Sequence, residues 1–138
     1  MKEYEILRII TKLLIPVILL FGLYIQFHGD YSAGGGFQAG VILASSFILY
    51  NIIFGVNVGK AVMSQRGAKI FMSLGLLLYT FVGFLGILLG GNFLEYNLLG
   101  PTSTYGQITG IFLIELGVGL TVGSVMVLIF YSFNKEDI

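Results

Sequence analysis

Four apolar segments, each long enough to cross a lipid bilayer, dominate this sequence and restrict it to one class of fold. They lie at about 6–27, 36–55, 68–89 and 107–133. An α-helix rises about 1.5 Å per residue, so about 20 residues cross a hydrocarbon core about 30 Å thick. Only 10% of the residues are charged, too few to cover a water-facing surface. We therefore predict an all-α integral membrane protein with four transmembrane helices, in which residues 1–138 form a single membrane domain.

The basic residues predict how these helices are oriented. The two loops at 28–35 and 90–106 contain no Lys or Arg, so every positive charge falls on the other side of the membrane. These charges are Lys2, Arg8, Lys12, Lys60, Arg66, Lys69 and Lys135. Since cytoplasmic loops carry the excess of Lys and Arg, both termini are predicted to be cytoplasmic. The loops at 28–35 and 90–106 are then on the outer side.

The first outer loop and the start of the second helix form a glycine-rich segment from His28 to Gly40, with the sequence HGDYSAGGGFQAG. Small residues recur every four positions at Gly36, Gly40 and Ala44, a pattern typical of closely packed membrane helices. The glycine spacing and the preceding apolar helix exclude a dinucleotide-binding loop. We therefore interpret this segment mainly as a helix-packing motif, formed by Gly34, Gly35, Gly36, Phe37 and Gly40.

Glu115 is the residue in the last apolar segment that most suggests a function. Insertion of an acid near the centre of a membrane helix costs about 2.5–3.5 kcal/mol, so such a residue faces protein or water. Gly119 and Gly123 follow on the same helical stripe and allow another backbone to approach closely. Two interpretations remain open, a group that handles protons or cations, and a carboxyl group that is hydrogen-bonded across a subunit contact.

His28 and Asp30 are the remaining titratable candidates, at the outer end of the first helix. A histidine beside an acid can relay protons, although such a histidine more often caps a helix end. The sequence has no cysteine and one histidine, which disfavours disulfides, iron–sulfur clusters, thiolate metal sites and paired haem ligands. We find no nucleophile–base pair, metal-ligand cluster or phosphate loop, and the net charge is zero. The sequence thus predicts no enzyme, metal site or cofactor, and no nucleic-acid partner.

The glycine-rich segment resembles the H-G-x-x-S/T-P-G-G-G-F-Q-x-G signature of the MrpB (MnhB) family, the B subunits of Mrp-type multi-subunit Na⁺/H⁺ antiporters. The run from Glu115 to Val122, ELGVGLTV, is similar to an acid-x-Gly-Val-x-Leu segment in the family's last helix. Chain length and helix number agree as well. Two departures are Ala33 in place of a proline and Asp30 in place of a second histidine. The second departure replaces a titratable base with an acid.

This resemblance implies a membrane subunit of a monovalent cation (Na⁺)/proton antiporter in a prokaryotic cell (inner) membrane. Its partners would be the other membrane subunits of the complex, Na⁺, H⁺ and lipid, with proton-pumping subunits related to those of respiratory complex I. B-like subunits also occur in ion-pumping, membrane-bound hydrogenase complexes, and a purely structural scaffold is a further alternative. A stand-alone dimeric exporter is disfavoured, since small multidrug exporters place their glutamate in the first helix and use tryptophan nearby. The sequence leaves open which cation is carried and whether this subunit contacts it.

Overall fold

The computed structural model describes residues 2–29 and 34–134, with side chains from residue 4 onward. The described part is helical throughout its regular elements, and four of its helices are long and apolar enough to cross a membrane. This confirms the predicted all-α fold with four spanning helices. The elements are α1 (Lys2–Phe27), α2 (Gly36–Phe54), α3 (Val56–Val62), α4 (Gln65–Leu88), the 3-10 helix η1 (Tyr96–Leu98) and α5 (Ser103–Phe133).

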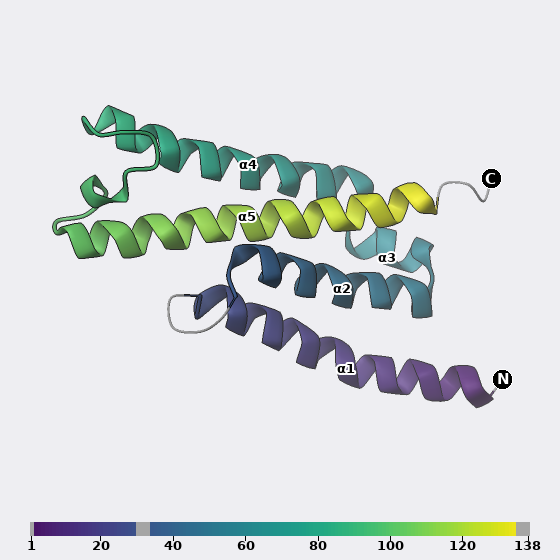
Figure 1. Cartoon of the computed structure of the whole chain (residues 1–138). Coiled ribbons are helices and arrows are strands. Elements are labelled where there is room, and N and C mark those ends of the chain that lie inside the picture. Colours follow the sequence, from purple (N-terminus) through teal and green to yellow (C-terminus); the bar gives the residue numbers. More distant parts are fainter. Residues whose placement is uncertain (1, 30–33, 135–138) are drawn as a thin grey trace.

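The four long helices lie side by side in a row, in the order α4, α5, α2, α1 (Figure 1). Helix α5 is the central element, because it packs against both α4 and α2, whereas α1 packs mainly against α2. The chain enters α1 and leaves α5 at the same end of the molecule (Figure 1). The loop from α1 to α2 and the segment from α4 to α5 lie at the opposite end.

Local sequence explains where several helices begin and end. The hydroxyl of Ser64 accepts a hydrogen bond from the Gly67 amide (3.0 Å) and caps α4. Thr102 caps α5 in the same way, so α5 begins at Ser103 rather than near residue 107. Gly55 ends α2 with φ of +101°, a backbone conformation that glycine adopts readily. This turn starts the short helix α3, which the sequence did not predict.

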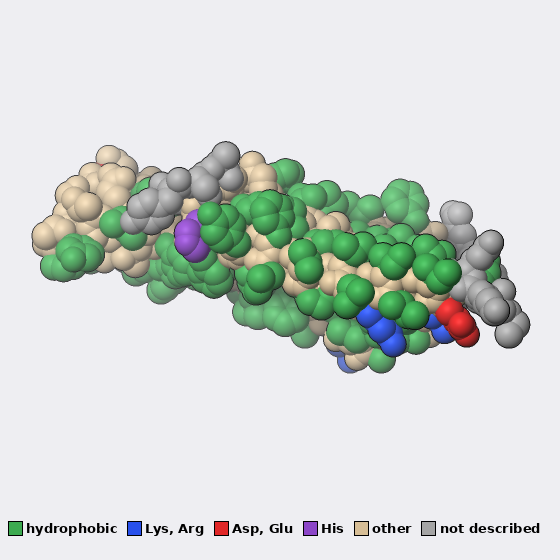
Figure 2. Space-filling model, turned by 90° about the horizontal axis from the view of Figure 1, so that it is seen from below, with side chains coloured by type: hydrophobic (Ala, Val, Ile, Leu, Met, Phe, Trp, Pro, Cys, Tyr) green, Lys and Arg blue, Asp and Glu red, His purple; other side chains and the backbone are tan. Residues whose placement is uncertain are grey.

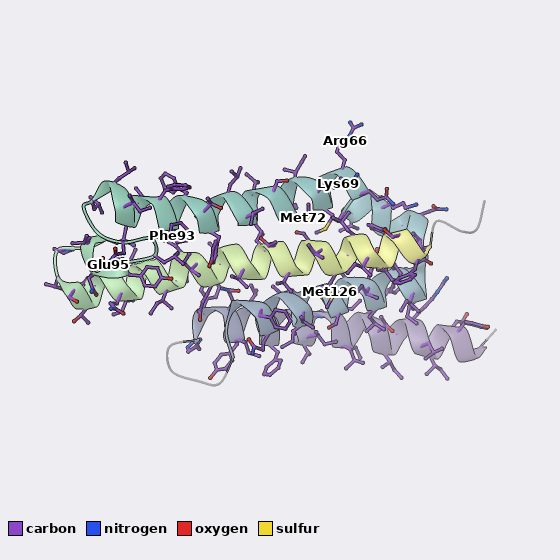
Figure 3. The ribbon with its side chains drawn as sticks, turned by 45° about the horizontal axis from the view of Figure 1, so that its top comes forward. Arg66, Lys69, Met72, Phe93, Glu95 and Met126 are labelled. Atoms are coloured by element: carbon purple, nitrogen blue, oxygen red, sulfur yellow. The ribbon has the colours of Figure 1, made fainter. Side chains whose placement is uncertain are left out.

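The end of the molecule where α1 and α4 begin is basic, and we call it the basic end. Arg66 and Lys69 project there from the start of α4 (Figure 3), and Lys and Arg gather towards this end on the face drawn in Figure 2. The Nζ atom of Lys12 lies 5.9 Å from the ring centre of Phe54, and the Nζ atom of Lys60 lies 5.9 Å from the ring centre of Tyr131. The Tyr131 hydroxyl donates to the Met63 carbonyl at 2.7 Å and ties α5 to the chain after α3.

The segment from 89 to 102 folds back onto α4 and α5. Phe93 and Glu95 lie beside these helices at the end opposite the basic end (Figure 3). The Phe93 ring contacts the backbone of Gly83 and meets the Phe84 ring edge-on, with 6.0 Å between ring centres. Leu94 has a φ of +62°, and its amide donates to the Gly83 carbonyl at 3.4 Å. This segment therefore extends the contact between α4 and α5.

Candidate site around Glu115

The Glu115 side chain of α5 lies against glycines from both ends of the loop that joins α1 to α2. A Cβ atom added to Gly29 would lie 2.6 Å from Glu115 Oε2, and one added to Gly35 would lie 3.0 Å from Oε1. A Cβ added to Gly36 would overlap the backbone carbonyl oxygen of Glu115. The structure therefore joins Glu115 and the glycine-rich segment, which are about 80 residues apart in the sequence, into one site. We call Glu115 with Gly29, Gly35 and Gly36 the glycine–glutamate site.

Close backbone contact between α2 and α5 holds this site in place. A Cβ atom on Gly40 would lie 2.7 Å from the Gly119 carbonyl oxygen and 3.1 Å from the Gly123 nitrogen. A Cβ on Gly123 would in turn lie 3.3 Å from the Gly40 carbonyl oxygen. Glycines on both helices thus let the two backbones touch. The backbone of Glu115, one turn before Gly119, has little freedom to move relative to α2.

The carboxylate of Glu115 lies at the N-terminus of α2. Gly35 is the N-cap residue of this helix, and its amide donates to Gln38 Oε1 at 3.0 Å. The first amides of a helix lack intrahelical partners, and together with the helix dipole they place partial positive charge at this end. The site therefore offers an acidic group an electrostatic partner within a largely apolar part of the protein.

Gln26 is a polar neighbour of this site that was not predicted from the sequence. Its side chain is 5% exposed, and its Oε1 would lie 2.5 Å from a Cβ atom on Gly119. Its Nε2 is buried and has no hydrogen-bond partner among the described residues. The available signal was the amide itself, a polar residue near the end of an apolar segment. Only the contact with α5 shows that it faces protein.

The other candidates from the sequence have different surroundings. The exposed ring of His28 stacks on Tyr24 with 4.5 Å between ring centres, and its Nδ1 lies 3.2 Å from the Tyr24 carbonyl oxygen. Asp30 lies outside the described residues. Gly34 has a φ of +110° and forms the turn into α2, whereas Phe37 is 57% exposed on the surface of α2. The described residues contain no group of three acidic, histidine or cysteine side chains that could hold a metal ion.

A cavity of about 330 Å³ begins beside the glycine–glutamate site and extends towards the basic end. Along α5 it is lined from Leu116 through Gly119 to Val127, and it reaches Met63 and Phe71. Gln26 lines the end of the cavity near Glu115, and most of the remaining lining is apolar. The surroundings of Glu115 therefore include the loop between α1 and α2 on one side and this cavity on the other.

A separate polar cluster occupies the folded-back segment between α4 and α5. Glu95 accepts a hydrogen bond from the Asn92 amide at 2.7 Å, and Asn97 Oδ1 accepts one from Gln107 Nε2 at 2.6 Å. Burial raises the pKa of the Tyr96 phenol above its usual value, and Tyr79 adds to this shift. The Tyr96 ring packs against the backbone of Gly110. These contacts fix the segment to the start of α5 and do not include Glu115.

Comparison with known proteins agrees with this architecture. The sequence profile of a family described as a domain related to the MnhB subunit of Na⁺/H⁺ antiporter matches residues 6–128. The chain belongs to the MnhB family. The match extends over the whole membrane region, because residues 6–128 include all four spanning helices almost completely.

Individual MnhB-family relatives match along nearly their full length. A protein of Staphylococcus epidermidis that carries the name antiporter subunit mnhB2 is 34% identical over 138 residues, covering 97% of both chains. A protein of the same name from Staphylococcus aureus is 34% identical over 139 residues, again covering 97% of both chains. The match to the MnhB family includes both parts of the glycine–glutamate site, the loop glycines and Glu115. The chain is a multi-pass membrane protein of this family.

Proposed function

We propose that this chain serves as a membrane subunit of a multi-subunit Na⁺/H⁺ antiporter and that Glu115 is its proton- or cation-exchanging group. The observation that carries the proposal is the position of the Glu115 carboxylate, against Gly29 and Gly35 at the N-terminus of α2. A carboxylate in a membrane-spanning helix is energetically costly, and such groups typically mark the pathway of an ion or a proton. Membership in the MnhB family supplies the type of transport.

The geometry suits exchange because glycines leave the carboxylate close to the loop backbone. No side chain projects from Gly29 or Gly35 between the loop and the Glu115 oxygens. The ionised form interacts favourably with the positive end of α2, and the protonated form avoids the cost of a charge in an apolar environment. A group that is stabilised in both forms can bind and release a proton or a monovalent cation.

The arrangement of the helices supports a role within a larger complex. A single row of helices leaves apolar side chains exposed on both of its faces, among them Leu20, Leu76 and Phe81. Lipid covers part of such a surface, and we propose that other membrane subunits of the antiporter cover the rest. Both termini and the basic end would face the cytoplasm of a prokaryotic cell, with the glycine–glutamate site nearer the outer side.

Replacing Glu115 with Gln in the assembled complex tests the function of the carboxylate. We expect Na⁺/H⁺ exchange in membrane vesicles to fall on the order of 100-fold, since a side-chain amide does not bind and release a proton near neutral pH. Co-purification of the partner subunits should be unchanged, because Gln has nearly the same shape. Glu95→Gln is the matched control, as Glu95 lies in the separate cluster, and we expect it to retain exchange.

A structural scaffold is the second candidate, and the backbone contact of Gly40 with Gly119 and Gly123 favours it. In that case α2 and α5 would provide a rigid surface for larger subunits without contacting the ion. The same experiment separates the two functions. If Glu115→Gln assembles normally and retains full exchange, the ionic function is wrong and the scaffold stands.

A further inference from the structure

The buried amide of Gln26 has a hydrogen-bond donor that the described structure does not use. Gln26 is 5% exposed, and its Nε2 is both inaccessible and without a hydrogen-bond partner among the described residues. Most buried polar groups in proteins are hydrogen-bonded, so an exception calls for an explanation such as a functional role. A hydrophobic residue of similar size would fill the same space at a lower cost.

The position of Gln26 relative to Glu115 supplies that explanation. Gly119 lies four residues after Glu115 on α5, and side chains four residues apart on a helix are neighbours. Gly119 has no side chain, and the Gln26 amide takes its place, with Oε1 2.5 Å from the position of a Cβ. The amide of α1 therefore occupies the location from which a side chain on α5 would contact the Glu115 carboxylate.

We propose that Gln26 is a positioning residue for Glu115, which donates a hydrogen bond from Nε2 to the carboxylate when that side chain turns away from the glycine-rich loop. This proposal rests on the proposed function of Glu115. The carboxylate then has two positions, one at Gly29 and Gly35 and one at Gln26, about one helical turn closer to the basic end. The contact at Gln26 favours the ionised form, since hydrogen bonds to a charged group are stronger than those between neutral groups.

The cavity lies beside the second position, on the side away from the glycine-rich loop. Gln26 and Gly119 line the end of the cavity nearest Glu115, and the cavity continues past Gly123 to Val127. In the first position the carboxylate faces the loop between α1 and α2, and in the second it faces the cavity. Movement between two such positions is what alternate exposure of one binding group requires.

Replacing Gln26 with Met in the assembled complex tests this inference. Met has similar length and no donor, so we expect Na⁺/H⁺ exchange to fall about tenfold, as for loss of one hydrogen bond to a charged group. Thermal stability should stay the same or rise, because an unpartnered amide is removed. Asn51→Leu is the matched control, since Asn51 is also a buried amide with an unpartnered atom, at the other end of α2. We expect it to retain exchange.

A double substitution shows whether Gln26 acts through Glu115. The shorter Asp in Glu115→Asp cannot reach Gln26, so adding Gln26→Met should cause no further loss of exchange. If Gln26→Met retains exchange, or its loss adds fully to that of Glu115→Asp, the inference about Gln26 is wrong while the function of Glu115 stands. If Glu115→Gln itself retains exchange, the proposed ionic function of Glu115 is wrong. Gln26→Leu replaces Gln26→Met should the latter fail to assemble.

Discussion

The glycines around Glu115 are opposed by different atoms of that residue, and this decides how each tolerates a side chain. Gly29 and Gly35 face the carboxylate oxygens, which can move by rotation of the Glu115 side chain. Gly36 faces the backbone carbonyl of Glu115, which can move only if α5 moves. The same glycine-rich segment therefore combines positions that affect the carboxylate with a position that sets the distance between two helices.

Gly36→Ala should destabilise the protein by about 1–3 kcal/mol, the usual cost of adding a methyl group to a tightly packed contact. The added Cβ overlaps the Glu115 backbone, so α2 and α5 must separate. A lower midpoint of thermal unfolding for the purified complex would measure this effect. Gly67→Ala is the control, because its Cβ would be in ordinary contact, 3.4 Å from Ser64 Oγ. Equal midpoints for both variants would show that the two helices are not in backbone contact.

At the level of helices and loops, the sequence predicts the four spanning helices and the glycine stripe, but not the short helix α3 or the start of α5 at Ser103. The four spans follow from local hydropathy, and the stripe of Gly36 and Gly40 follows from spacing within one helix. The contact of Glu115 with Gly29 and Gly35 joins parts of the chain about 80 residues apart, and no local pattern encodes such pairing. Gln26 was missed for the same reason, since its importance depends on a glycine in another helix.

The folded-back segment from 89 to 102 shows a second limit of local patterns. Its apolar run is too short to indicate a helix or a strand, and its position depends on Gly83, where the Phe93 ring contacts the backbone of α4. The sequence could not pair these two residues, because a glycine in a membrane helix can face lipid, another helix or a loop. The structure shows that Gly83 faces the loop and packs against the aromatic ring of Phe93.

Phe93→Ala should release this segment from α4. We expect a loss of about 1–2 kcal/mol in local stability, below the roughly 3–5 kcal/mol for a fully buried Phe, because Phe93 is 47% exposed. Faster hydrogen exchange of the amides in 90–100, including the Leu94 amide bonded to Gly83, would measure the release. Leu88→Ala is the control, as Leu88 is 79% exposed at the end of α4. Similar exchange in both variants would contradict a docking role for Phe93.

At the scale of the whole molecule, the two ends differ in charge as well as in structure. Arg8, Lys12, Lys60, Arg66 and Lys69 lie at or near the basic end, where Lys12 and Lys60 rest on aromatic rings. The loops at the opposite end contain no Lys or Arg, and they hold the glycine–glutamate site and the folded-back segment. If the basic end is cytoplasmic, the loop side of Glu115 faces outward and the cavity extends inward.

Single cysteines introduced at the two ends test this orientation, and the chain suits the test because it contains no native cysteine. Thr104 is exposed at the start of α5, and Asn57 is exposed in α3 near the basic end. A membrane-impermeant maleimide added to intact cells should label Thr104→Cys and should label Asn57→Cys only after the cells are broken open. The reverse pattern would contradict the predicted orientation and would place the cavity, rather than the loop side of Glu115, towards the outside.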